Sequence, residues 1–210
     1  KLGNTSKTLL LILVIILCVL RSYSATRTAT TNGNWSNPAT WGGNPVPTAS
    51  DDVTINNGIN VTVNAAAYCN TLTTANSGTL TISGTNTLTV TGLINMFRPS
   101  ANNTSFTIAV GTGSLVAGAL TMNATTTTRN NIITISTGTV TINGTVTTGT
   151  TGCQFVFTGN GLLKFGGSFS GGPASLTAAN GTIEYTGTAP VIQAFTGNYY
   201  NLVYSGNGTT

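Results

Sequence analysis

The chain has 210 residues, of which 40% are hydrophobic and only 5% are charged, with a formal net charge of +4. This apolar content is large enough to bury a core, which argues against a disordered chain. Beyond position 24, four cations stand against three carboxylates without forming a basic stripe, which argues against nucleic acid as a partner.

The N-terminal segment has the pattern of an export signal. Lys7 precedes an unbroken apolar run over residues 9–20. This run is shorter than the roughly 20 residues that a membrane-spanning helix needs, so an uncleaved anchor is disfavoured. Ser22 and Ser24 supply the small residues that precede a cleavage site. We therefore predict a signal peptide over residues 1–24 and an exported protein.

Residues 25–50 differ in composition from everything that follows. They contain both tryptophans, Trp35 and Trp41, and three of the six prolines. The open end of a repetitive β structure exposes apolar side chains and unpaired backbone groups, which need a cover. We predict that residues 25–50 form an N-terminal cap, not a regular coil, and that the two tryptophans seal the first coil.

From residue 51 onward, apolar and polar residues alternate between glycines. One phrase, Gly-polar-apolar-polar-apolar-polar-Gly, occurs at 78–84, 138–144 and 181–187. Each copy predicts a short half-buried strand between turns, and recurrence about every 20 to 25 residues predicts coils stacked on coils. The predicted fold is all-β: a right-handed single-stranded parallel β-helix over residues 51–210, with about seven coils. A β-sandwich array is the alternative, which the short repeat disfavours.

Two polar stretches interrupt the predicted coils. Residues 93–104 and 125–131 break the alternation, and we predict a loop at each. The interval from Gly78 to Gly113 is longer than the usual repeat, and the first loop is expected to account for the excess. The last phrase, residues 205–210, stops at a turn, so we expect the β-helix to be truncated there. A membrane contact is expected only through an anchor or sorting domain further along the chain.

Two cysteines, Cys69 and Cys153, follow the leader. Their separation in sequence corresponds to about four coils, or roughly 15 to 20 Å at the spacing of paired strands. A disulfide requires Cα atoms within about 7 Å. We predict that both thiols are free and buried.

Four segments have a distinctive pattern: the Trp-x5-Trp-Gly-Gly opening within 34–55, the Gly/Thr-rich repeats of 61–84 and the closing segments at 183–189 and 199–208. Through these segments the sequence resembles a family of exported, repetitive surface proteins of Bacteroidota-type bacteria. The likeness covers nearly all of residues 30–210. The resemblance implies a right-handed parallel β-helix in an adhesin-like or gliding-related protein that is secreted or held at the cell surface after crossing the outer membrane. It implies no catalytic activity.

The residue inventory argues against catalysis. The chain has no histidine, so neither an imidazole base nor an imidazole metal ligand is possible. The carboxylates are Asp51, Asp52 and Glu184. The first two are neighbours that point to opposite faces of a strand, and the third lies roughly 30 Å away at the spacing of stacked strands. A paired acid and base needs about 5 to 9.5 Å. We therefore expect that the protein is not an enzyme and that it binds no cofactor.

Two sets of residues are weak candidates for binding. Asp51 and Asp52 could hold Ca²⁺ with backbone carbonyls, although an aspartate that starts a strand more often accepts hydrogen bonds from turn amides. Trp41, Tyr199 and Tyr200 could stack on sugars. The alternatives are that Trp41 belongs to the cap and that the two tyrosines alternate in and out of a strand.

The sequence therefore predicts a structural or adhesive stalk in a secreted or cell-surface protein, without catalysis in these residues. The first alternative is a carbohydrate-binding module that uses outward aromatic residues or the 98–104 loop to hold extracellular polysaccharide. A less favoured alternative is an ice-binding solenoid, because Thr-x-Thr occurs at 71–73, 79–81, 87–91, 139–141 and 145–147. Uneven coil lengths are expected to keep these threonines out of one regular plane.

Overall fold

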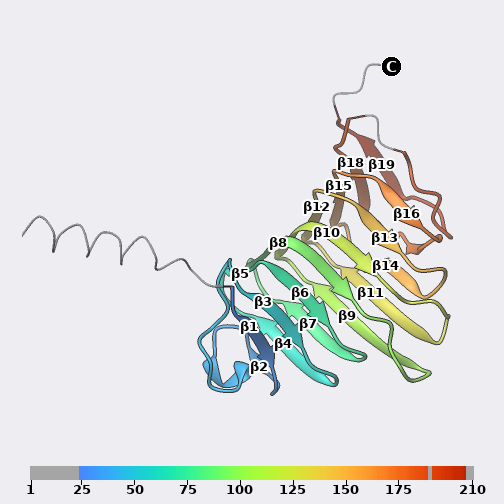
Figure 1. Ribbon diagram of the computed structural model, residues 1–210. Coiled ribbons are helices and arrows are strands. Elements are labelled where there is room, and N and C mark those ends of the chain that lie inside the picture. The colour runs from blue at the N-terminus through green and yellow to red at the C-terminus, as the bar shows by residue number, and fades with distance from the viewer. Residues whose placement is uncertain (1–23, 189–190, 207–210) are drawn as a thin grey trace, which may run out of the picture.

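The computed structural model describes residues 24–188 and 191–206, and they form a parallel β-helix of about eight turns (Figure 1). Every pair of named strands is parallel, and each strand inside a ladder pairs with its equivalents one turn before and one turn after it. This confirms the predicted fold class and excludes the β-sandwich. Apart from Ser24, the predicted signal peptide lies outside the described residues.

Each regular turn contributes three strands, one to each of three faces. Face A contains β1 (Thr26–Ala29), β3 (Asp52–Ile55), β6 (Thr71–Thr74), β13 (Val146–Thr148) and β16 (Phe169–Gly171). Face B contains β2 (Gly33–Asn34), β4 (Ile59–Val63), β7 (Gly78–Ile82), β9 (Thr104–Val110), β11 (Arg129–Ile135), β14 (Cys153–Phe157) and β17 (Ser175–Thr177). Face C contains β5 (Ala67–Cys69), β12 (Thr139–Ile142), β15 (Leu162–Phe165), β18 (Thr182–Tyr185) and β19 (Asn201–Tyr204).

Two long strands pass around the corner from face C to face A. The first halves of β8 (Thr87–Met96) and β10 (Ser114–Met122) pair within face C, and their second halves pair within face A. The register shifts between Ala117 and Ala119. A Cβ on the intervening Gly118 would lie 2.3 Å from the carbonyl oxygen of Thr91 in the preceding turn, so only glycine fits this corner.

The core is a set of side-chain columns that run along the helix axis. On face B, one column places Val61, Leu80, Ile108, Ile133 and Phe155 directly over one another. All of these side chains are buried. Because side chains alternate across a strand, the residues between them face outward and are mostly Thr, Asn or Ser. The alternation in the sequence therefore predicts correctly which residues form the core.

The core becomes aromatic toward the C-terminal end. Phe155, Phe165, Phe169, Tyr185 and Phe195 form one ring cluster with centroid separations of 4.6 to 6.4 Å. Most of the pairs meet edge to face, the arrangement that the ring quadrupole favours.

Coil length varies only in the connections, while the strands stay in register. Val61 pairs with Leu80 of the next turn, and Leu80 pairs with Ile108 of the turn after that, although the second of these turns is the longer one. The predicted coil from Gly78 to Gly113 is wrong, because its two ends are not equivalent positions. Gly78 begins β7 on face B, whereas Gly113 precedes β10, which begins on face C. The repeated glycine-bracketed phrase thus marks a strand and not a whole coil.

The predicted loops are shorter than expected. β8 continues to Met96, which is fully buried, so the first loop covers residues 97–103 and does not begin at 93. The second loop ends where β11 begins, at Arg129.

Residues 25–50 cover the end of the β-helix and also contribute two strands to its sheets, because β1 pairs with β3 and β2 pairs with β4.

Both cysteines are free and buried, as predicted. Cys69 lies on face C and Cys153 on face B. Burial, aided by the nearby carboxylates Asp52 and Asp51, raises the pKa of the Cys69 thiol to about 12, and burial likewise raises the pKa of Cys153. Because the thiolate is the reactive form, both residues act as small core side chains.

Candidate functional site

Trp41 is a structural residue of the cap. It ends the short 3₁₀ helix η1 (Pro38–Trp41) and is fully buried. Its indole Nε1 donates a 2.7 Å hydrogen bond to the carbonyl oxygen of Trp35, and the two rings meet edge to face at 4.9 Å. This places both tryptophans where the sequence predicts a seal over the first coil. The Trp41 ring is enclosed and offers no surface on which a sugar could stack.

Asp51 holds the start of face A to the cap. Its carboxylate accepts hydrogen bonds from the backbone amides of Thr48 (2.8 Å) and Ala25 (3.1 Å) and from the Thr48 hydroxyl. Arg27 lies 3.7 Å away as an ion-pair partner. Burial opposes ionisation of this carboxyl, but the hydrogen bonds from Thr48 and Ala25 and the charge of Arg27 together hold its pKa below the usual value.

Asp52 points away from Asp51 and joins neighbouring turns. It accepts hydrogen bonds from the Thr71 hydroxyl (2.7 Å), the Asn70 amide (2.9 Å) and the Ser24 hydroxyl (3.2 Å). The Thr71 bond is the main cause of the lowered pKa of Asp52. The carboxylate oxygens of both aspartates are therefore occupied by hydrogen bonds from groups at strand starts and in turns. Within the described ranges, no group of three or more Cys, Asp or Glu side chains is placed to hold a metal ion.

Asp51→Asn is expected to lower the free energy of unfolding by about 1–3 kcal/mol at neutral pH, because a buried hydrogen-bonded charge is lost. The folded-state pKa of Asp51 lies below its unfolded value. Its stabilising contribution is therefore present above the unfolded pKa, near 4, and disappears as the pH falls through the folded pKa. Urea denaturation of both proteins should show curves that differ at pH 7 and converge in strong acid. A difference that is independent of pH would contradict this role.

Tyr199 is half-buried and Tyr200 is exposed, but both precede β19 and do not alternate within a strand. Tyr199 packs against the core, and its hydroxyl donates a 2.5 Å hydrogen bond to the carbonyl oxygen of Gln193. Burial, together with the neighbouring Tyr185 hydroxyl 2.9 Å away, raises the pKa of Tyr199. Tyr200 is 62% exposed. Of the three aromatic binding candidates, Tyr200 alone presents its ring to solvent.

Outward threonines stack in columns in spite of the uneven coil lengths, because the loops absorb the differences. One outward column of face A consists of Thr28, Thr54, Thr73, Asn95, Thr121, Thr147 and Ser170. However, the Thr-x-Thr segments are divided among the faces: 71–73 and 145–147 on face A, 79–81 on face B, 87–89 and 139–141 on face C. The adjacent column of face A also contains Leu93 and Ala119.

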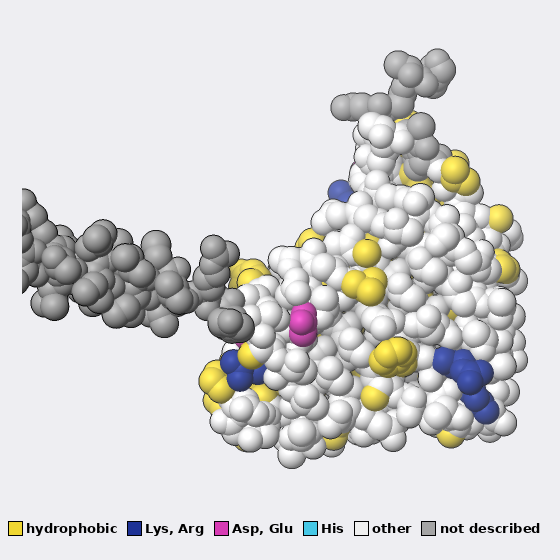
Figure 2. All heavy atoms as spheres, viewed as in Figure 1, with side chains coloured by type: hydrophobic (Ala, Val, Ile, Leu, Met, Phe, Trp, Pro, Cys, Tyr) yellow, Lys and Arg dark blue, Asp and Glu magenta, His cyan; other side chains and the backbone are white. Residues whose placement is uncertain are grey.

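The corner between faces A and B carries the most distinctive group of side chains. Arg98, in the loop after β8, donates from Nη1 to the Thr125 hydroxyl of the next turn at 3.2 Å. Arg129, at the start of β11, donates from Nε to the Asn102 side-chain oxygen of the preceding turn at 2.9 Å. Phe97 precedes Arg98 and is 50% exposed. Figure 2 shows the largest group of Lys or Arg side chains in this view at one edge of a mostly uncharged surface, with smaller charged areas elsewhere.

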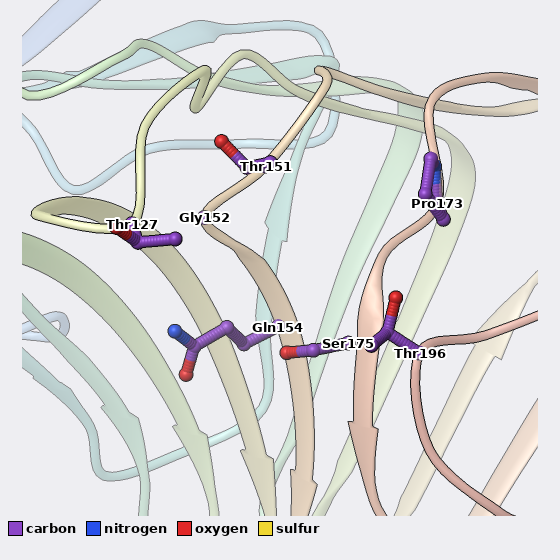
Figure 3. A pocket seen from close by; sticks show the side chains of 7 residues that line it. All are labelled: Thr127, Thr151, Gly152, Gln154, Pro173, Ser175 and Thr196. Atoms are coloured by element: carbon purple, nitrogen blue, oxygen red, sulfur yellow. The ribbon is translucent and has the colours of Figure 1, made fainter.

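A shallow pocket of about 160 Å³ continues the same corner toward the C-terminal end (Figure 3). Thr127, Gln154, Ser175 and Thr196 lie in a row across successive turns and bring hydroxyl and amide groups to a lining that also includes Gly152 and Pro173. Thr127 closely follows Thr125, the partner of Arg98, in the same loop. The pocket and the arginines are therefore parts of one surface, which we call the A–B corner.

The sequence does not predict the pairing of Arg98 with Arg129 at one corner. It shows two polar loops, each with an arginine, but the two loops are far apart in the chain and coil length varies from turn to turn. Over residues 24–188 and 191–206, what distinguishes these two arginines from the other cations is the absence of an opposite charge beside them. Among the described residues, the ion pairs are Arg27–Asp51 and Lys164–Glu184. In that part of the chain, Arg98 and Arg129 have no carboxylate partner.

No protein-family model, curated protein or solved structure matches this chain. Within the described residues, no helix is long and apolar enough to cross a membrane.

Proposed function

We propose that this chain is a rigid structural or adhesive stalk in an exported surface protein. The observation that carries the proposal is the set of continuous side-chain columns, in which each turn covers the apolar side chains of the turn before it. Bending such a structure would separate buried columns and parallel backbone ladders at once. The export signal predicted from Lys7 and residues 9–20 supports an extracellular setting.

The neutral exterior supports the same role. Stacked parallel strands place equivalent side chains directly above one another, and like charges in such a column would repel. The outward column of face A carries Thr, Asn and Ser throughout. Where a charged column does occur, on face C, it pairs opposite signs: Lys164 Nζ lies 2.9 Å from a carboxylate oxygen of Glu184.

We propose further that these residues carry no acid–base catalysis. Asp51 and Asp52 belong to the first full turn, and five strands of the sheet order separate β3 from β18, where Glu184 lies. Each of the three carboxylates is engaged by neighbouring groups, Glu184 by Lys164 and the Ser205 hydroxyl.

The stalk proposal predicts resistance to a protease of broad specificity. Subtilisin is expected to trim the ends and leave residues 52–185 as one fragment, because proteolysis requires local opening that the stacked turns oppose. Mass spectrometry over a time course measures this. Leu120→Asp is the matched control, because it places a charge at a fully buried position and should admit rapid internal cleavage. Rapid cleavage of the unmodified chain between turns would contradict the proposal.

A further inference from the structure

The A–B corner concentrates positive charge that nothing within the described residues neutralises. Arg98 and Arg129 belong to adjacent turns, and their loops contact one another directly, since the Asn103 amide donates a 2.6 Å hydrogen bond to the Thr128 carbonyl oxygen. The described ion pairs involve Arg27 and Lys164 only. In a surface with so few charges, two neighbouring guanidinium groups dominate the local electrostatic field.

The corner is held rigidly from beneath. Asn131 is fully buried, and its side chain ties both loops: Oδ1 accepts from the Ala124 amide at 2.8 Å, and Nδ2 donates to the Phe97 carbonyl oxygen at 2.9 Å. Asn123 adds hydrogen bonds to the Asn95 side chain and the Met96 carbonyl oxygen. The backbone that carries Phe97 and Arg98 is therefore fixed before any ligand arrives, which lowers the entropic cost of binding.

Each guanidinium keeps donors available for a ligand. A guanidinium has five N–H donors in a planar fork that matches the two oxygens of a carboxylate or sulfate. The hydrogen bonds to Thr125 and Asn102 occupy one donor on Arg98 and one on Arg129. These two bonds orient the arginines without neutralising them.

The neighbouring groups suit a sugar. Phe97 offers a half-exposed aromatic ring beside Arg98, and apolar faces of sugar rings pack on such surfaces. Along the same corner, Thr127, Gln154, Ser175 and Thr196 present hydroxyl and amide groups from successive turns (Figure 3). This row offers hydrogen-bonding groups to the hydroxyls of a linear sugar chain, and the apolar part of the pocket lining offers contact to the faces of its rings.

We propose that the A–B corner binds an acidic polysaccharide, with carboxylate or sulfate groups on Arg98 and Arg129 and neutral sugar hydroxyls in the pocket. This goes beyond the stalk role and gives the stalk a ligand. Nucleic acid fits less well, because binding to a phosphate backbone requires many phosphate contacts and stacked bases, whereas two cations and one aromatic ring are present at this corner among the described residues.

Biolayer interferometry with immobilised glycans tests the proposal. The chain is expected to bind polygalacturonate or dextran sulfate and not neutral dextran, with weaker binding at higher salt. Arg98→Gln and Arg129→Gln should each lower the affinity about tenfold, the effect of losing a charge-assisted hydrogen bond. Lys164→Gln removes the same charge from face C and should change the affinity by less than about twofold, as expected for a remote charge. Comparing the two anionic glycans identifies the preferred acid group.

Further variants separate binding from folding. Arg98→Lys keeps the charge but loses the planar fork, so an intermediate affinity is expected. Phe97→Ala should weaken binding without altering the thermal melt, because the ring is half-exposed. Equal losses for Arg98→Gln and Lys164→Gln, no retention on either anionic glycan, or tighter binding to single-stranded DNA would each overturn the proposal. None of these outcomes bears on protease resistance, so the stalk role is tested separately.

Discussion

Phe165→Ala is expected to lower the free energy of unfolding by about 3–5 kcal/mol, the cost of removing a large buried aromatic side chain. Phe165 is fully buried and packs against Phe155, Phe169 and Tyr185, with centroid separations of 5.8, 4.6 and 5.6 Å. The cavity would be shared by several stacked turns. Since those turns are joined by parallel ladders on all three faces, they have little freedom to collapse into the space.

Equilibrium urea denaturation, monitored by circular dichroism, measures the loss. Thr141→Ala is the matched control: Thr141 pairs with Lys164, the outward neighbour of Phe165, and lies on the outer side of face C. Its replacement should change stability by less than about 0.5 kcal/mol. Phe165→Leu should fall between the two. If Phe165→Ala and Thr141→Ala were equally mild, the aromatic cluster would not be the stabilising core of the C-terminal turns.

The alternation of residue types predicts the inside and the outside of the β-helix well. In 59–63 and 139–142 every apolar side chain faces inward, and Ile59, at the strand start, is partly buried against the core. A strand read in isolation carries this information because the pleat has a period of two. The tryptophan cap is also predictable, since both rings occur among prolines and glycines at one end of the repeats.

The assignment of strands to faces is not predictable from the same pattern. The phrases at 78–84 and 138–144 look alike but lie on faces B and C. What places them is the path of the chain around each corner, and that depends on close backbone contacts such as the one at Gly118. For the same reason the A–B corner could not be predicted from the sequence, because its two arginines come to lie in adjacent turns only through the path of the chain between them.

Trp41→Ala is expected to destabilise the N-terminal turns by about 3–5 kcal/mol, since it removes a large buried ring. Trp41 is fully buried against Trp35 and donates to its carbonyl oxygen, so the substitution creates a cavity and leaves that oxygen without its donor. A solenoid unfolds from exposed ends, because each turn is stabilised mainly by its neighbours. The loss should therefore be local: β1 to β4 should open while the C-terminal turns remain folded.

Hydrogen exchange measured by mass spectrometry distinguishes this local opening from global destabilisation. Amide protection is expected to fall first in β1 to β4 and to stay unchanged in β12 to β18. Trp41→Phe retains an aromatic ring but has no N–H donor, so it should lose less protection than Trp41→Ala. Tyr200→Ala, at a ring 62% exposed, is the control for loss of an aromatic side chain outside the core. Uniform loss of protection along the chain would show that the cap stabilises the whole solenoid at once, and unchanged protection would show that the first turn needs no seal.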